Sequence, residues 1–72
     1  MGDPLFEALR DLRRDLAKEA QVPPYVIFND ATLRAMTATR PASLTEFGEI
    51  SGVGAKKLKA FGETFLQVIR QY

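Results

Sequence analysis

Apolar residues recur at helical spacing in the first part of the chain, and charged residues fill the positions between them. The apolar positions follow the series i, i+4, i+7 and i+11: Leu5, Leu9, Leu12 and Leu16. This series places the leucines on one face of an amphipathic helix. Asp3 and Pro4 stand just before it, as an N-cap and a first helical residue. We predict that the helix ends before Pro23, because proline disfavours helical backbone angles at the residue that precedes it.

A run of large apolar residues follows the proline pair: Tyr25, Val26, Ile27 and Phe28. A single strand would have no partner elsewhere in the chain, so we predict a short helical turn that begins with Pro24. One turn cannot bury every side chain of the run, and Ile27 and Phe28 are the expected core residues. For Tyr25 two alternatives remain open. The ring is either partly buried with its hydroxyl in water, or exposed as a platform on which a nucleic-acid base stacks.

The next predicted helix covers residues 31–39, and Asn29 with Asp30 caps its start. Leu33 and Met36 supply its inner face, while Arg34 points outward.

The segment that follows predicts a short helix and then a tight turn. Ser43 and Glu46 have the spacing of a capping box, in which each side chain accepts a hydrogen bond from a backbone N–H group of the other's turn. Gly52 can adopt the positive φ that strains other residues, and Gly54 suits the N-cap of the last helix. Val53 stands between them and is expected in the core.

The last helix is predicted to run from Gly54 or Ala55 to the end of the chain. Its apolar face is broad: Leu58, Phe61, Phe65, Leu66, Val68, Ile69 and Tyr72. Gly62 lies inside this helix at a cost of about 1 kcal/mol relative to alanine, and we expect it to admit the close backbone approach of another helix. The patterns together predict an all-α fold, a compact bundle of about five short helices with a Gly-Val-Gly hairpin before the last. A length of 72 residues corresponds to one domain, so we assign residues 1–72 to a single domain.

The composition excludes most kinds of active site. The chain has no cysteine and no histidine, so it lacks a disulfide framework, the commonest general base and the commonest transition-metal ligand. The serine and threonine hydroxyl groups have no histidine to activate them, and the glycines lack the spacing of a phosphate-binding loop. We expect neither an enzyme nor a bound metal or cofactor. No apolar run approaches the ~20 residues of a membrane span, and no signal peptide is visible.

The formal net charge is only +1, so any binding of nucleic acid must come from a local patch. In the first helix, residues of opposite charge stand three apart: Glu7–Arg10, Asp11–Arg14 and Asp15–Lys18. Such pairs favour a solvated face that compensates its own charge. The alternative is a basic strip that faces DNA, formed by Arg10, Arg13 and Arg14.

Lys56 and Lys57 lie in the first turn of the last helix, where a positive charge opposes the helix macrodipole. A sequence selected only for helix stability would carry acidic residues there. The two lysines are therefore either solvated residues beside a packing turn, or part of a site where the free N–H groups of the helix bind a phosphate.

Two separate motifs occur in this order: Val22-Pro23-Pro24-Tyr25-Val26-Ile27-Phe28-Asn29-Asp30, and Ile50-x-Gly52-Val53-Gly54-x-x-Lys57 with Phe61-Gly62. With these motifs the chain resembles, over nearly its whole length, the HRDC domain. That domain is the helicase-and-RNase-D C-terminal module of RecQ-type DNA helicases and RNase D. The first motif is most similar to bacterial RecQ sequences. The resemblance implies a compact all-α bundle of about five helices.

The resemblance also implies an accessory domain of a helicase that acts in DNA repair and recombination. Such a domain lies C-terminal to the ATPase core and helps the enzyme to choose and hold DNA structures. In bacterial members an aromatic residue at the Pro-Pro-Tyr position contacts single-stranded DNA, and Tyr25 matches that position. Basic residues near it are the expected phosphate partners, and we select four: Lys18, Arg34, Lys56 and Lys57.

The alternative function is a regulatory domain that docks on the helicase core or on another protein without binding DNA. Its docking surface would be an exposed patch that includes Glu7, Asp11 and Asp15. The expected partners are single-stranded or partly single-stranded DNA and the rest of the parent helicase, with no membrane. We expect a monomer in the bacterial cytoplasm, associated with the nucleoid. The chain ends look like those of a domain excised from a longer protein, so part of the full-length function is expected to lie outside it.

Overall fold

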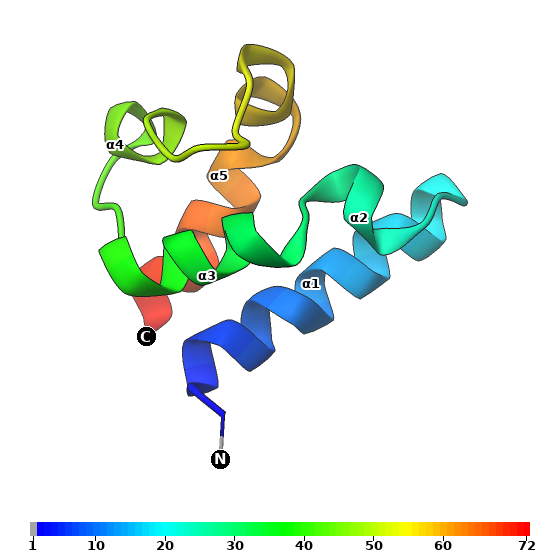
Figure 1. The fold of residues 1–72 in the computed structure, drawn as a ribbon, viewed down its shortest axis with the longest axis horizontal. Helices are drawn as coiled ribbons and strands as arrows, with labels where there is room; N and C mark the ends of the chain where they lie inside the picture. Colours follow the sequence, from blue (N-terminus) through cyan, green and yellow to red (C-terminus); the bar gives the residue numbers. More distant parts are fainter. Residues whose placement is uncertain (1) are drawn as a thin grey trace.

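The computed structural model describes residues 2–72, and helices account for most of them (Figure 1). Five helices follow one another along this part of the chain: α1 (Pro4–Ala20), α2 (Pro24–Ile27), α3 (Asp30–Thr39), α4 (Leu44–Gly48) and α5 (Ala55–Gln71). No strand occurs among residues 2–72. The predicted all-α bundle is confirmed, including the short helical turn after the proline pair.

Side chains cap three of the helices where the sequence predicts. Asp3 accepts a hydrogen bond from the Leu5 N–H group at 2.8 Å, and Asn29 accepts one from the Thr32 N–H group, also at 2.8 Å. Ser43 Oγ accepts from the Glu46 N–H group at 3.2 Å. The carboxylate of Glu46 accepts from the N–H group of Ala42 at 3.3 Å, one residue before the N-cap. The bonds to Asp3, Asn29 and Ser43 satisfy N–H groups that the first turn of a helix leaves without a partner.

The two long helices organise the bundle. α1 packs against α2, α3 and α5, and α4 packs against α5. In Figure 1 the longest axis is horizontal, and α2 lies toward one end of it while α4 lies toward the other. The principal extents of the molecule are 32 × 29 × 19 Å. The surfaces of α2 and α4 therefore lie at opposite ends of the molecule.

The core is centred on the ring of Phe28. This ring is fully buried and meets three other phenylalanine rings edge to face, Phe65 at 5.0 Å, Phe61 at 6.0 Å and Phe47 at 6.2 Å between centroids. Aromatic pairs prefer this geometry and gain stability beyond their buried area. The predicted burial of Ile27 and Phe28 is confirmed.

The hairpin before α5 has the predicted conformation. Gly52 has a φ of +95°, and Gly54 is the N-cap of α5. Val53 between them is only 8% exposed. A Cβ atom at Gly52 would also collide with the hydroxyl of Thr32, which donates a hydrogen bond of 3.1 Å to the Ser51 carbonyl oxygen. Glycine is thus required here both by the backbone angle and by the space.

Of two expectations for α5, one stays a prediction and one is wrong. A Cβ atom at Gly62 would lie 3.2 Å from Leu44 Cδ2 and 3.0 Å from Leu58 Cδ1, so side chains fill the space beside this glycine and the close backbone approach of another helix stays a prediction. Tyr72 is 57% exposed and does not join the apolar face, because α5 ends at Gln71 and the ring lies beyond the last turn.

Candidate nucleic-acid interface

Tyr25 and Val26 form an exposed apolar surface on α2. The side chain of Tyr25 is 68% exposed and that of Val26 is 43% exposed. The reason is local: α2 contains a single turn, and that turn directs Ile27 and the following Phe28 into the core. Of the two alternatives for Tyr25, the exposed ring is the one observed.

The basic residues divide into two groups. Five arginines pair with carboxylates at 2.7–3.8 Å: Arg10 with Glu7, Arg13 with Asp30, Arg14 with Asp11, Arg40 with Asp3, and Arg70 with Glu63. The other five basic residues have no ion pair within residues 2–72: Lys18, Arg34, Lys56, Lys57 and Lys59. All four predicted phosphate partners belong to this second group. No carboxylate among residues 2–72 lies within ion-pair distance of any of the four.

The ion pairs along α1 argue against both the basic strip and the acidic docking patch that the sequence left open for this helix. The predicted pairs Glu7–Arg10 and Asp11–Arg14 are confirmed at 3.4 and 3.2 Å, whereas Asp15 pairs with Arg14 at 3.4 Å and not with Lys18. Each of these carboxylates has an arginine beside it, so this face carries neither a continuous basic strip nor a continuous acidic patch. It is the solvated, self-compensated face that the charge spacing favours.

Lys18 lies in the last turn of α1, just before the reversal that leads into α2. Gln21 has a left-handed backbone with a φ of 57°, and its N–H group bonds back to the carbonyl oxygens of Ala17 and Lys18. The chain therefore reverses at once, and α2 packs on α1. Lys18 and Tyr25 belong to adjoining helices, with the exposed Glu19 as an acidic neighbour.

The start of α5 carries three lysines, and one of them contacts the residue that follows α2. Lys57 is half-buried, and its Nζ atom lies 5.6 Å from the ring centre of Phe28, the residue that ends α2. Cation–π contacts of this kind contribute about 0.5–1 kcal/mol at exposed sites. Lys56 and Lys59 are exposed. Our sequence reasoning missed Lys59, although its i, i+3 spacing from Lys56 places the two on one helix face.

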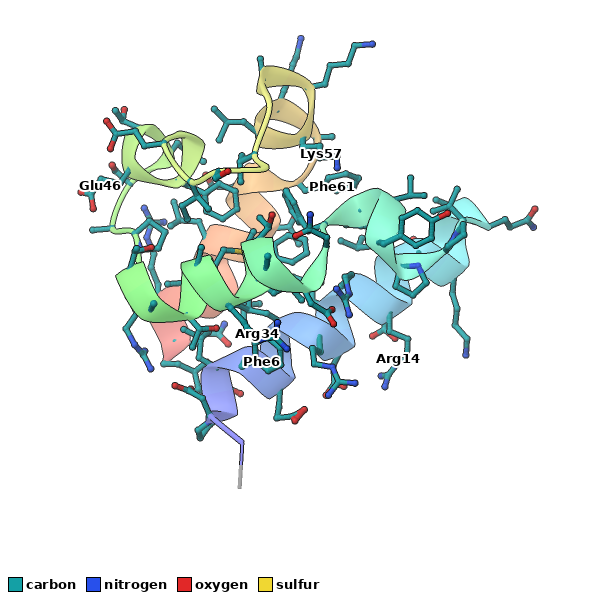
Figure 2. All side chains as sticks on the ribbon, in the orientation of Figure 1. Phe6, Arg14, Arg34, Glu46, Lys57 and Phe61 are labelled. Atoms are coloured by element: carbon teal, nitrogen blue, oxygen red, sulfur yellow. The ribbon has the colours of Figure 1, made fainter. Side chains whose placement is uncertain are left out.

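Arg34 does not gather with the other candidates. Its guanidinium carbon lies 5.9 Å from the ring centre of Phe6, and that of Arg10 lies at the same distance from the same ring. In Figure 2, Arg34 and Phe6 lie on one side of α3, and Lys57 lies on the other. Of the predicted phosphate partners, Lys57 thus contacts the residue that follows α2, whereas Arg34 of α3 contacts Phe6 of α1.

Arg13 has a positioning role that our sequence reasoning did not assign. Its Nη1 atom donates hydrogen bonds to the Phe28 carbonyl oxygen at 3.0 Å and to Asp30 Oδ1 at 2.7 Å. The hydrogen bond from Arg13, together with its charge, lowers the pKa of Asp30 below the ordinary value of 3.8. The side chain of Arg13 is only 11% exposed. These contacts tie the junction of α2 and α3 to α1 and so hold the turn that presents Tyr25.

Other kinds of site find little support in the part of the chain that the structure describes. Residues 2–72 contain no group of three or more side chains that could hold a metal ion. Within the same range no helix has the length and apolar character that a membrane crossing requires.

Comparisons with known proteins agree with this architecture. A family model described as HRDC domain matches residues 3–69. The chain is 44% identical over 68 residues to the ATP-dependent DNA helicase RecQ of Haemophilus influenzae, covering 94% of this chain and 11% of that protein. It is 44% identical over 71 residues to RecQ of Bacillus subtilis, covering 99% of this chain and 12% of that protein.

Among solved structures, the chain matches the D. radiodurans RecQ HRDC domain 3. The TM-score is 0.89 and the sequence identity 45%, covering 93% of this chain and 88% of that one. The chain thus spans nearly all of a single solved domain but only about a tenth of the length of the curated helicases.

Proposed function

The chain belongs to the HRDC domain family, and from this premise we propose that residues 1–72 form one accessory domain that holds single-stranded DNA for a RecQ-type helicase. HRDC domains are accessory domains of these helicases and have no catalytic activity of their own. The proposal concerns what this copy contributes to the parent enzyme. That contribution is weak binding of single-stranded DNA, which biases the parent enzyme toward particular DNA structures.

The observation that carries the proposal is the exposed ring of Tyr25. A tyrosine ring that is 68% exposed makes little contribution to the core, yet it stands beside another exposed apolar side chain, Val26. Bases of any sequence stack on such rings, with a gain of about 1–3 kcal/mol per base. Lys18 precedes α2 along the chain and Lys57 contacts Phe28 just after it, so two lysines without an ion pair among residues 2–72 flank this helix. In this proposal they meet the phosphates on either side of a stacked base. Arg34 is the outlying member of the predicted set.

Binding by so few contacts is weak and depends strongly on salt. If three or four lysines each meet one phosphate, the logarithm of the binding constant falls with the logarithm of salt concentration at a slope of about −2 to −3. The domain acts as a monomer in this proposal, in the bacterial cytoplasm where the nucleoid lies. A single domain would raise the overall affinity of the parent helicase for DNA, because tethering gives the domain a high effective concentration near the bound strand.

The test is a fluorescence-anisotropy titration of labelled oligo-dT with the 72-residue chain at low salt. Replacing Tyr25 by alanine is expected to lower affinity at least about 5-fold, the lower bound of one stacked base. Tyr72→Ala is the matched control, because this ring is also exposed but lies at the C-terminus, away from α2 (Figure 1). Both variants should melt at the temperature of the parent chain.

A second pair of variants tests the lysines. Lys56→Gln with Lys59→Gln should weaken oligo-dT binding and reduce the steepness of its salt dependence. Arg10→Gln is the control, since that arginine already pairs with Glu7. Equal affinities of the parent chain and the Tyr25→Ala variant would overturn the proposal.

A further inference from the structure

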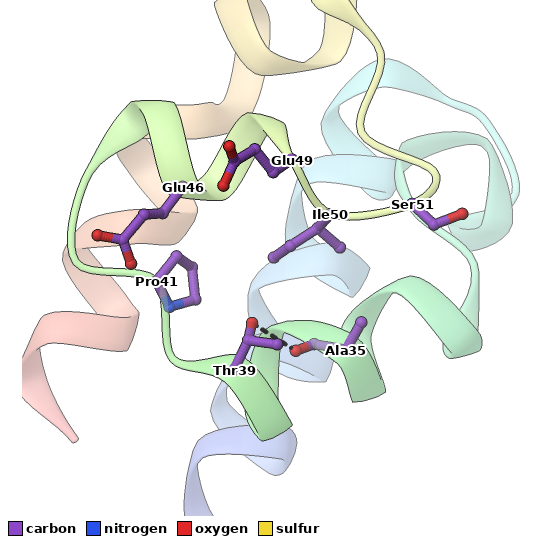
Figure 3. Close-up of a pocket in the computed structure, with 7 residues that line it drawn as sticks. All are labelled: Ala35, Thr39, Pro41, Glu46, Glu49, Ile50 and Ser51. Carbon is purple, nitrogen blue, oxygen red and sulfur yellow. Dashed lines mark hydrogen bonds between the residues drawn. The ribbon is translucent and has the colours of Figure 1, made fainter.

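A groove separate from the tyrosine surface lies between α3 and α4. Its volume is about 350 Å³, and Figure 3 shows the residues that line it: Ala35, Thr39, Pro41, Glu46, Glu49, Ile50 and Ser51. A hollow of this size accepts one or two side chains of a partner. It lies at the α4 end of the molecule, opposite α2 along the longest axis (Figure 1).

The floor of the groove is apolar, and two polar groups beside it already have hydrogen-bond partners. Ile50 is 8% exposed and Pro41 is buried, with the half-buried Ala35 beside them. The hydroxyl of Thr39 donates to the Ala35 carbonyl oxygen at 2.8 Å (Figure 3), and the Ser51 carbonyl oxygen accepts from Thr32 at 3.1 Å. The floor therefore suits an apolar side chain better than a polar one.

The rim carries negative charge that the described part of the chain does not neutralise. Six of the nine acidic residues pair with arginines. The three acidic residues with no ion pair among residues 2–72 are Glu19, Glu46 and Glu49, and the last two both line this groove. The nearby arginines are already engaged, Arg40 with Asp3 at 3.8 Å and Arg70 with Glu63 at 3.8 Å.

We propose that this groove binds an extended segment of another protein, one that inserts a branched apolar side chain between flanking lysine or arginine residues. Charge complementarity argues for this occupant, because Glu46 and Glu49 leave two carboxylates for cations beside an apolar floor. The same carboxylates repel the phosphates of DNA. The inference therefore adds a protein-binding surface to the proposed DNA-binding one, at the other end of the domain.

This surface differs from the acidic patch expected from the sequence. The carboxylates of Glu7, Asp11 and Asp15 each lie beside an arginine, and that face offers no unpaired charge to a basic partner. Within residues 2–72, the carboxylate of Glu46 accepts a hydrogen bond only from the backbone N–H group of Ala42, at 3.3 Å, which leaves its charge available.

The test is a titration of the ¹⁵N-labelled chain with a capped peptide of sequence Gly-Arg-Leu-Arg-Gly, followed by amide chemical shifts. We expect the shifts to be largest at the groove residues Ala35, Ile50 and Ser51. The combined variant Glu46→Gln, Glu49→Gln should weaken binding at least about 5-fold. A glutamine at position 46 keeps an acceptor for the Ala42 N–H group, so the start of α4 is retained.

Two control peptides separate the parts of the proposal. Replacing leucine by serine removes the side chain for the floor, and replacing both arginines by glutamates reverses the charge. Each is expected to bind much more weakly than the parent peptide. Absence of shifts at the groove with the parent peptide, or equal binding by the double variant, would overturn the inference.

A parallel titration with oligo-dT keeps this inference distinct from the DNA proposal. The oligonucleotide should shift amides around Tyr25 and leave those of Ile50 and Ser51 in place. Either ligand can fail while the other binds, so each proposal can be rejected separately.

Discussion

The guanidinium group of Arg13 in α1 donates a hydrogen bond to the carbonyl oxygen of Phe28, at 3.0 Å and across fifteen residues of sequence. Phe28 ends α2 and its ring occupies the centre of the core. The same Arg13 nitrogen reaches Asp30 at 2.7 Å, in the first turn of α3. One side chain therefore links α1, the end of α2 and the start of α3, next to the turn that carries the exposed Tyr25.

Replacing Arg13 by methionine should lower the free energy of unfolding by about 1–3 kcal/mol. Methionine keeps the apolar stem but leaves the Phe28 carbonyl oxygen without its partner. Urea denaturation monitored by circular dichroism measures this difference. Arg14→Met is the control, because the ion pairs of that exposed residue contribute little. Equal stability of the Arg13 variant and the parent chain would show that the bond does not secure α2.

The stability of the domain should decrease in acid partly through Asp30. The hydrogen bond and charge of Arg13 lower the pKa of Asp30 below its ordinary value of 3.8. Because the folded pKa lies below the unfolded one, the contribution of Asp30 is fully present above the unfolded pKa and is lost as pH falls through the folded value. Asp30→Asn should therefore flatten the decrease of melting temperature with pH below about pH 4.

A double-variant cycle identifies Arg13 as the cause. In the Arg13→Met background, the further change Asp30→Asn should have little additional effect on the acid part of the melting curve. If the two substitutions act additively there, the coupling is contradicted.

Gly52→Ala should destabilise the chain by at least about 1–2 kcal/mol, the penalty of a left-handed backbone for a residue with a Cβ atom. The observed φ is +95°, and the new Cβ atom would collide with the Thr32 hydroxyl. Thermal unfolding provides the measurement. Gly54→Ser is the control: no atom lies within 4 Å of a Cβ there, and serine is a favourable N-cap. Comparable melting of the two variants would contradict this account of the hairpin.

Phe28→Ala should leave the chain largely unfolded at room temperature. Truncation of a buried phenylalanine costs about 3–5 kcal/mol, which is comparable to the total stability of many small domains. Far-ultraviolet circular dichroism would report the loss of helix. Val26→Ala, two residues away on the exposed side of α2, should keep nearly all of the helical signal. A folded Phe28→Ala variant would show that the remaining phenylalanines suffice for the core.

The helix boundaries could be predicted because their causes are local. Asp3, Asn29 and Ser43 each bond an N–H group two or three residues further on, so a short stretch of sequence contains both partners. The positive φ of Gly52 is predictable for the same reason. The exposure of Tyr25 was not predictable in this way, because a continuous apolar run has no period that tells one face from the other.

Contacts between residues that are far apart in the sequence could not be predicted from local patterns. Arg13 and Asp30 are separated by seventeen residues, and only the packing of α3 on α1 brings them together. The groove likewise combines residues of α3 with residues of α4 and the loop after it, so no pattern in the sequence brought its members together. The i, i+3 rule predicted two of the ion pairs on α1 correctly. It also paired Asp15 with Lys18, whereas in the structure Arg14 pairs with both Asp11 and Asp15.

The division of the basic residues has a consequence for how such domains diversify. Among residues 2–72, all the ion pairs are made by arginines, and no lysine takes part in one. Apart from Lys57, which contacts the Phe28 ring, natural variation can therefore add, remove or reverse lysine charges with little penalty in folding. Related domains of this family would then keep the same architecture while differing in the molecules they bind.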